Sequence, residues 1–199
     1  MASIQEPIEL DRISLDTLDI DIEGITPLIT HRWSEKAKKE MRDKQAGVTR
    51  KKKEPKNPQA EYESAFYRLP DGSAGMPATA FKAATVGGAR NFDSVSMVQV
   101  KQGIFVMGEG PDQLVAIEGE PIFTEMPVRI AMGTADLRYR PLFDPWGAHL
   151  TIQFNPVVLS ANSVIALVDA GGIGGVGEWR PSAPKSHTGS YGMYRVVGA

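Results

Sequence analysis

The cations of this chain are concentrated in one segment, which gives that segment the chemistry of a phosphate binder. Residues 36–56, KAKKEMRDKQAGVTRKKKEPK, hold ten of the 22 lysines and arginines, although the whole chain has a net charge of -2. Such a local positive field attracts polyanions in a salt-dependent way. A solvated surface arm is the competing interpretation. The cations of this run that we assign to a nucleic-acid interface are Lys36, Lys39, Arg50, Lys51, Lys52 and Lys53.

A second group of residues combines aromatic rings with cations outside this run. Aromatic rings can stack on unpaired bases, while arginine and lysine contact the phosphates between them. The candidate stacking residues are Trp33, Trp179 and Tyr191. The candidate phosphate contacts are Arg32, Arg90, Arg138, Arg140, Arg180 and Lys185. These residues predict a surface for RNA or single-stranded DNA.

The closing stretch GGIGGVGEWRPSAPK contains the spacing GxGxxG at Gly172, Gly174 and Gly177. A dinucleotide-binding loop with this spacing follows a strand and opens a helix. Here a predicted helix precedes the glycines and Pro181 follows them, so we predict no cofactor. Because glycine lets a backbone approach a ligand closely, Gly174 and Gly175 are assigned to the nucleic-acid interface.

Residue types needed for several other chemistries are missing or badly spaced. The chain has no cysteine, which excludes disulfides, thiolate catalysis and cysteine-based zinc sites. The histidines, His31, His149 and His187, lie too far apart in sequence for a metal-binding motif. Asp19, Asp21 and Glu23 alternate with apolar residues and should face solvent. No metal site is therefore predicted.

Length and composition indicate one domain, residues 1–199, of an ordinary soluble class. Hydrophobic residues make up 42% of the 199 residues and charged residues 23%, close to globular averages. The sequence shows neither a secretion signal nor an apolar run of membrane-spanning length, so we expect a cytoplasmic protein without membrane contact.

The elements that must position these residues read as a mixture of strands and helices. Residues 15–24 alternate like a half-buried strand, a helix should run from Ser34 toward Gly47, and residues 49–61 should form a mobile loop. A small-faced helix that begins at Pro77 should pack against a sheet, and another should run from Ser160 to a cap at Gly171. The segments 94–108, 113–132, 148–154 and 190–197 read as strands of one antiparallel sheet, interrupted by a turn-rich stretch at 138–147. The class is α+β, with a βαββαβ order typical of a ferredoxin-like fold.

Two of these segments resemble the repeat-associated mysterious protein (RAMP) superfamily, especially the backbone subunits of CRISPR effector complexes. The first is MPATAFKAATVGGAR, with Pro77, Thr79 and Lys82 opening a helix. The second is the glycine-rich segment before the last strand, with Gly174, Gly175, Gly189 and Gly192. The resemblance implies a ferredoxin-like, RRM-related fold with nucleic acid on one surface, to which Lys82 would contribute. It also implies that residues 34–60 form a thumb-like basic insertion.

We therefore predict a non-catalytic protein that binds RNA or single-stranded DNA and assembles side by side along it, as a homo-oligomer or filament. Two alternatives stay open. Some RAMP-related endonucleases place a general acid/base histidine in a comparable region, so His31 with Lys36 or Tyr191 could cleave RNA without a metal. A structural or inhibitory protein could instead bind another protein through residues 138–147, where arginine and aromatic residues alternate.

Overall fold

A four-stranded antiparallel sheet joins segments from both ends of the chain. The computed structural model describes residues 9–48, 55–130, 134–184 and 187–198. The strand order of the sheet is β10-β1-β9-β5, where β1 is Asp16–Gly24, β5 is Ile104–Val106, β9 is Gly147–Phe154 and β10 is Tyr194–Val196. β1 pairs with β9 from Asp16 opposite Phe154 to Glu23 opposite Gly147. As predicted, Ile20 and Ile22 face the core from this sheet. The final strand, β10, is shorter than the predicted range 190–197.

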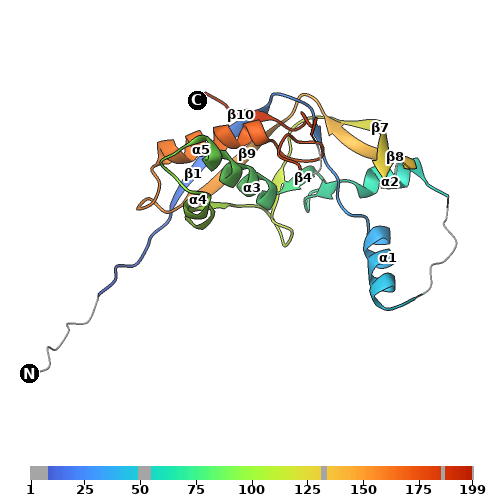
Figure 1. Ribbon diagram of the computed structural model, residues 1–199, viewed down its shortest axis with the longest axis horizontal. Helices are drawn as coiled ribbons and strands as arrows, with labels where there is room; N and C mark the ends of the chain where they lie inside the picture. The colour runs from blue at the N-terminus through green and yellow to red at the C-terminus, as the bar shows by residue number, and fades with distance from the viewer. Residues whose placement is uncertain (1–8, 49–54, 131–133, 185–186, 199) are drawn as a thin grey trace, which may run out of the picture.

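Three helices gather at the end of the molecule that carries this sheet (Figure 1). They are α3 (Ala78–Gly88), continued by the short η1 (Ala89–Asn91), α4 (Met97–Gly103) and α5 (Ala161–Gly174). Phe81 of α3 and Leu167 of α5 belong to the same buried cluster as Ile20 and Leu150 of the sheet. Burial of these side chains is the main force that holds the helices on the sheet.

Helices α3 and α5 pack through glycine against glycine. A Cβ on Gly88 would lie 2.6 Å from the Leu167 carbonyl oxygen, and a Cβ on Gly171 would lie 2.8 Å from the Ala84 carbonyl carbon. The small face predicted for the first helix therefore serves a close contact with another helix, in addition to the sheet. Gly171 lies inside α5 at this contact, and the helix does not stop there as predicted but ends at the cap Gly175, with φ 67°.

The remaining strands form two further sheets rather than extending the first, so the prediction of one sheet was wrong. One has the order β2-β8-β7, with β2 (Leu28–Ile29), β8 (Thr134–Phe143) and β7 (Pro121–Ile130). The other has the order β3-β4-β6, with β3 (Tyr67–Arg68), β4 (Ala74–Pro77) and β6 (Leu114–Ala116).

The segment 138–147, predicted to be turn-rich, is strand as far as Phe143. Pro141 lies inside β8, opposite Phe123 of β7, and its carbonyl accepts a hydrogen bond from the Thr30 N–H at 3.3 Å. The turn is confined to Asp144–Trp146, which includes a cis bond before Pro145.

Two stretches predicted as strand or loop are helices because of their capping residues. Residues 97–103 form α4, where the Ser96 and Gln99 side chains and backbones bond reciprocally in a capping box. Asn57 likewise caps α2 (Pro58–Ser64), its side chain accepting from the Ala60 N–H at 3.0 Å. A capping residue followed by a first-turn proline is the feature that the sequence analysis overlooked at Asn57 and Pro58.

The predicted helix after Ser34 is present as α1 (Glu35–Gln45). Figure 1 shows α1 projecting away from the rest of the molecule, below α2 in this view, and most of its described residues are exposed. Lys56, after the undescribed residues, forms an ion pair with Asp136 of β8 and donates to the Leu137 carbonyl at 2.7 Å. The segment between β2 and β3 is thus fixed to the molecule at its C-terminal end.

Candidate nucleic-acid interface

A partly buried ionic cluster joins the segment after β2 to the glycine-rich segment after α5. The Nδ1 atom of His31 lies 3.3 Å from Glu178 Oε1 and 3.3 Å from Nη2 of Arg140, while Arg140 Nη1 lies 3.5 Å from Glu178 Oε2. Backbone contacts run alongside, since the Glu178 N–H donates to the Ile29 carbonyl at 2.9 Å. The cluster therefore brings Arg32 and Trp33 to the same part of the molecule as Trp179 and Arg180.

Arg140 is the buried member of this cluster, with 8% of its side chain exposed, against 36% for Glu178. Burial lowers the pKa of Arg140, and the charge of Glu178 opposes that change. The hydrogen bond from His31 is the main cause that lowers the pKa of Glu178, and Arg140 acts in the same direction. The Arg140 Nε and Nη1 atoms make no hydrogen bond of good geometry with the described residues. Arg140 consequently depends on Glu178 for charge compensation.

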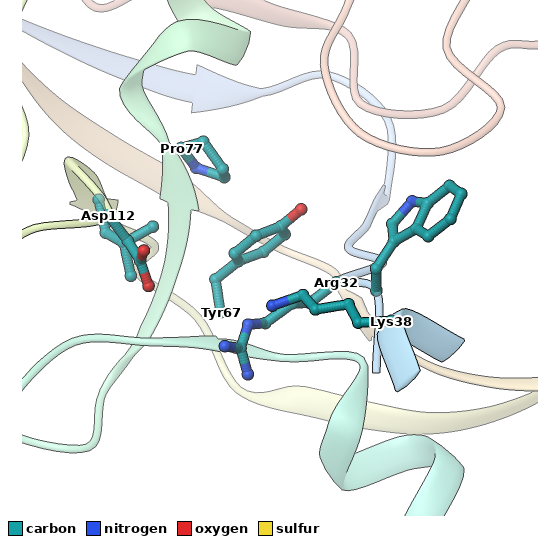
Figure 2. A pocket seen from close by; sticks show the side chains of 7 residues that line it. Arg32, Lys38, Tyr67, Pro77 and Asp112 are labelled. Carbon is teal, nitrogen blue, oxygen red and sulfur yellow. The ribbon is translucent and has the colours of Figure 1, made fainter. Parts of the chain in front are cut away.

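A cavity of about 250 Å³ opens beside this cluster. Its lining combines two cations, two aromatic rings and one carboxylate with apolar atoms: Arg32, Trp33, Lys38, Tyr67, Pro77, Asp112 and Leu114. Figure 2 shows the Tyr67 ring between Pro77 and Asp112 on one side and the Arg32 and Lys38 side chains on the other. Burial raises the pKa of Tyr67, while the nearby charge of Arg32 lowers it and that of Asp112 raises it.

The cavity is built where β3, β4, β6 and the start of α1 meet. Pro77 of β4 is paired with Leu114 of β6, and the Arg32 N–H donates to the Ala65 carbonyl at 2.9 Å. The Tyr67 hydroxyl reaches the His31 carbonyl at 3.5 Å. These contacts fix the segment 31–33 against β3, so that the cavity wall is held by backbone as well as side-chain contacts.

One carboxylate holds the two cations of the cavity together. Glu35 lies 2.8 Å from the Lys38 Nζ and 3.8 Å from the Arg32 Nη2. The hydrogen bond from Lys38 is the main cause that lowers the pKa of Glu35, with Arg32 and Arg42 contributing. An anion that enters the cavity would compete with Glu35 for these cations.

The glycine-rich segment uses its glycines for contacts within the chain. A Cβ on Gly177 would lie 2.5 Å from the Ile29 carbonyl oxygen, and a Cβ on Gly175 would lie 3.0 Å from the Tyr191 carbonyl oxygen. Gly174 belongs to α5. The predicted role of Gly174 and Gly175 in nucleic-acid contact is untested, and the close approach of Gly175 is explained by the chain's own backbone.

The same segment holds two of the predicted stacking residues together. The Trp179 and Tyr191 ring centroids are 5.7 Å apart in an edge-to-face arrangement, and the Tyr191 N–H donates to the Trp179 carbonyl at 3.2 Å. Trp179 has φ 54°, a conformation that a bulky residue rarely adopts unless its surroundings impose it. Its carbonyl packs against Gly189, where a Cβ would overlap the Trp179 carbonyl oxygen.

The other predicted interface residues are scattered. Lys39 is exposed on α1 and Arg90 is exposed on η1, while Lys82 of α3 lies over the Phe105 ring, 4.5 Å from its centroid. Arg138 forms an ion pair with Asp136 at 3.2 Å. Lys36 belongs to α1, but its side chain is not among those described. Residues that lie outside the described residues are Arg50, Lys51, Lys52, Lys53 and Lys185.

Three charged or aromatic cavity residues were not predicted as individual site residues: Lys38, Tyr67 and Asp112. Lys38 lies in the basic run and gave no reason to be preferred over its neighbours. Tyr67 and Asp112 lie in β3 and in the turn before β6, and only the pairing of β3, β4 and β6 brings them together. No local pattern could have indicated that juxtaposition.

The face of the four-stranded sheet away from the helices is acidic, as predicted for Asp19, Asp21 and Glu23. His149 of β9 lies among these carboxylates, with Nδ1 2.7 Å from Asp21 Oδ1 and Nε2 3.4 Å from Asp19 Oδ1. Among the described residues, no group of three or more histidine, aspartate or glutamate side chains is arranged to hold a metal ion. In the part of the chain that the structure describes, no helix has the length and apolarity to cross a membrane.

The pKa of His149 should depend on the carboxylates of this acidic face. The hydrogen bond to Asp21 is the main cause that raises the pKa of His149 above its ordinary value of 6.5, and Asp19 adds to it. Its charge therefore stabilises the fold fully below pH 6.5, and this contribution is lost as the pH rises through the raised pKa. We expect Asp21→Asn to move the NMR-measured pKa of His149 back toward 6.5. The control Asp93→Asn should leave it in place, and an unmoved pKa in Asp21→Asn would contradict the assignment.

Comparisons with protein families, with curated proteins and with solved structures give different results. No protein-family model matches the chain, and no curated protein matches it. Among solved structures, the chain is similar to the crystal structure of Cmr6 from Pyrococcus furiosus, with 9% sequence identity and a TM-score of 0.43. The similarity covers 93% of this chain and 100% of that chain. These comparisons do not assign the chain to a family.

Proposed function

We propose that this protein binds single-stranded nucleic acid without cleaving it. The binding surface would combine the cavity with the aromatic pair Trp179 and Tyr191. The observation that carries the proposal is the combination of Arg32, Lys38, Trp33 and Tyr67 around one cavity of about 250 Å³. Cations for the phosphates and rings for the bases are the two components that single-strand binding sites combine. The ionic cluster of His31, Arg140 and Glu178 brings Trp179 and Arg180 to the same side.

The charge distribution favours this location over the open face of the sheet. That face presents Asp19 and Asp21, whose side chains are 59% and 70% exposed. A phosphate backbone would be repelled there, whereas the cavity and α1 present exposed or half-buried lysines and arginines. The nucleic-acid strand should therefore pass across the cavity and along α1.

The ferredoxin-like core and the thumb-like insertion are part of this proposal. The strand order β10-β1-β9-β5 supports the core, because α3 and α4 connect β1 to β5 and α5 connects β9 to β10. The projection of α1 away from the rest of the molecule supports a protruding insertion within residues 34–60 (Figure 1). From the same core and insertion we also propose membership of the RAMP superfamily and a single domain over residues 1–199. Side-by-side assembly along the nucleic-acid strand is part of the same proposal.

Binding can be tested with fluorescently labelled, unstructured RNA and DNA oligonucleotides at several salt concentrations. For single strands, each phosphate contact contributes a slope of about -0.7 to the plot of log affinity against log salt concentration. Arg32→Gln and Lys38→Gln should each weaken binding several-fold and reduce this slope by about 0.7. Glu35→Gln should strengthen binding, because it frees both cations, and Lys101→Gln on α4 is the control that should change little.

Absence of oligonucleotide binding by the wild-type protein, or binding insensitive to salt, would refute the proposal. The same samples test the alternatives. RNA that is cleaved in the presence of chelator, with cleavage lost in His31→Ala, would support an endonuclease. A species without nucleic acid in size-exclusion chromatography would favour a protein-binding role. Complexes whose mass rises in steps with oligonucleotide length would support side-by-side assembly.

A further inference from the structure

The cavity has the size of a site for one small ring system. Pockets that hold drug-sized ligands measure about 300–1,000 Å³, and this one is slightly smaller at about 250 Å³. Tyr67 supplies an aromatic surface, while Pro77 and Leu114 supply apolar atoms. A planar ring could stack or pack here without displacing the backbone that forms the wall.

The charges in the cavity are separated across the Tyr67 ring. Arg32 and Lys38 lie on one side of the ring, and Asp112 lies on the other (Figure 2). Asp112 is exposed, and among the described residues no group forms a hydrogen bond or ion pair with its carboxylate. An ionised carboxylate only accepts hydrogen bonds, so a donor on a ligand that enters the cavity would replace water at Asp112 without displacing a protein partner.

We propose that the cavity accepts one unstacked nucleotide of the bound strand and that Asp112 selects for a base with an exocyclic amino group. This inference rests on the proposed function. Arg32 and Lys38 would hold the phosphate of that nucleotide, Tyr67 would contact the base, and Asp112 would accept from the amino group.

The chemistry of the bases gives the direction of the preference. Cytosine, adenine and guanine carry an NH₂ group, and aspartate or glutamate accepting from the cytosine amine is an established kind of contact. Uracil and thymine present a carbonyl oxygen at the position where cytosine presents its amine. A carboxylate repels that oxygen. Bases with an amino group should therefore enter the cavity at lower cost.

The experiment compares two unstructured twelve-residue RNAs, one of alternating C and A and one of U alone, together with the corresponding DNAs. We expect the wild-type protein to bind the C/A strand at least about fivefold more tightly, the low end of the discrimination that one base contact gives. Since adenine also stacks better than uracil, the decisive quantity is the ratio of the two affinities in variants. Asp112→Asn should reduce this ratio toward the value that stacking alone gives.

Asp93→Asn is the matched control, because it removes an exposed carboxylate that does not line the cavity. It should leave the affinity ratio unchanged, even if the loss of a negative charge strengthens binding to both strands. A ratio that is the same in the wild-type protein and in Asp112→Asn would overturn the selectivity while leaving nucleic-acid binding intact. Absence of binding to either strand would overturn the proposed function itself.

Discussion

Gly172→Ala is expected to destabilise the protein by roughly 3 kcal/mol or more, at or above the upper end of the usual cost of overpacking. Gly172 is buried in α5, and a Cβ there would overlap the backbone carbonyl of Tyr194 in β10. Neither partner can move away easily, because Tyr194 is 1% exposed and its strand is paired with β1. Urea unfolding followed by circular dichroism measures the change in free energy.

Gly87→Ala is the matched control for this substitution. Gly87 also lies in a helix, α3, but a Cβ there would have no neighbour within 4 Å. Alanine restricts the unfolded chain more than glycine does, so this variant should gain about 0.5–1 kcal/mol. Two helical glycines would thus respond with opposite signs. If Gly172→Ala were as stable as the wild-type protein, the close contact between α5 and β10 would be wrong.

These glycines also show why the sequence predicted the elements better than it predicted their roles. Gly171 was predicted as the end of a helix, because a C-terminal cap and a glycine needed for close packing are the same residue type. Only its contact with Ala84 distinguishes the two uses. The alternation of Leu18, Ile20 and Ile22, in contrast, identified β1 correctly, because the alternation that marks a half-buried strand is visible in a short stretch of sequence.

The sequence predicted the kinds of side chain at the candidate site, but not which residues come together there. Arg32 and Trp33 were identified from residue type, and both line the cavity. Tyr67 and Asp112 come from segments that pair through β4, and such pairing depends on contacts between residues distant in sequence. Glu178 was overlooked because a single glutamate among glycines has no recognisable spacing to His31, which lies 147 positions away.

Loss of the Glu178 carboxylate is the second substitution for which we expect a large effect. Removing one member of a buried ion pair typically costs about 3–5 kcal/mol, because the remaining charge is left uncompensated. Since Glu178 is 36% exposed, water can partly replace it, and about 2 kcal/mol is the expected cost of Glu178→Gln. The loss should appear in urea unfolding at pH 7.

The pH dependence of this variant provides an independent check. The pKa of Glu178 is lowered from its ordinary value of 4.5, first by the hydrogen bond from His31 and also by Arg140. Its stabilising contribution is therefore complete above about pH 4.5 and is lost as the pH falls through the lowered pKa of the folded state. The difference in stability between the wild-type protein and Glu178→Gln should shrink over that acidic range. A difference that stays constant down to the lowest pH would contradict the ionised pair.

Arg140→Met tests whether the cost comes from the uncompensated charge or from the lost contact. Methionine fills much of the same buried space without a charge, and replacing both members of a buried pair by uncharged groups is often close to neutral. Glu178→Gln should therefore lower the free energy of unfolding clearly less in the Arg140→Met background than in the wild-type protein. The difference between the two losses is the coupling energy, which for contacting residues is about 0.5–3 kcal/mol. If the two substitutions were additive, Arg140 would not depend on Glu178. The cluster would then hold the segment 31–33 against the glycine-rich segment through its backbone hydrogen bonds, such as that from Glu178 to Ile29.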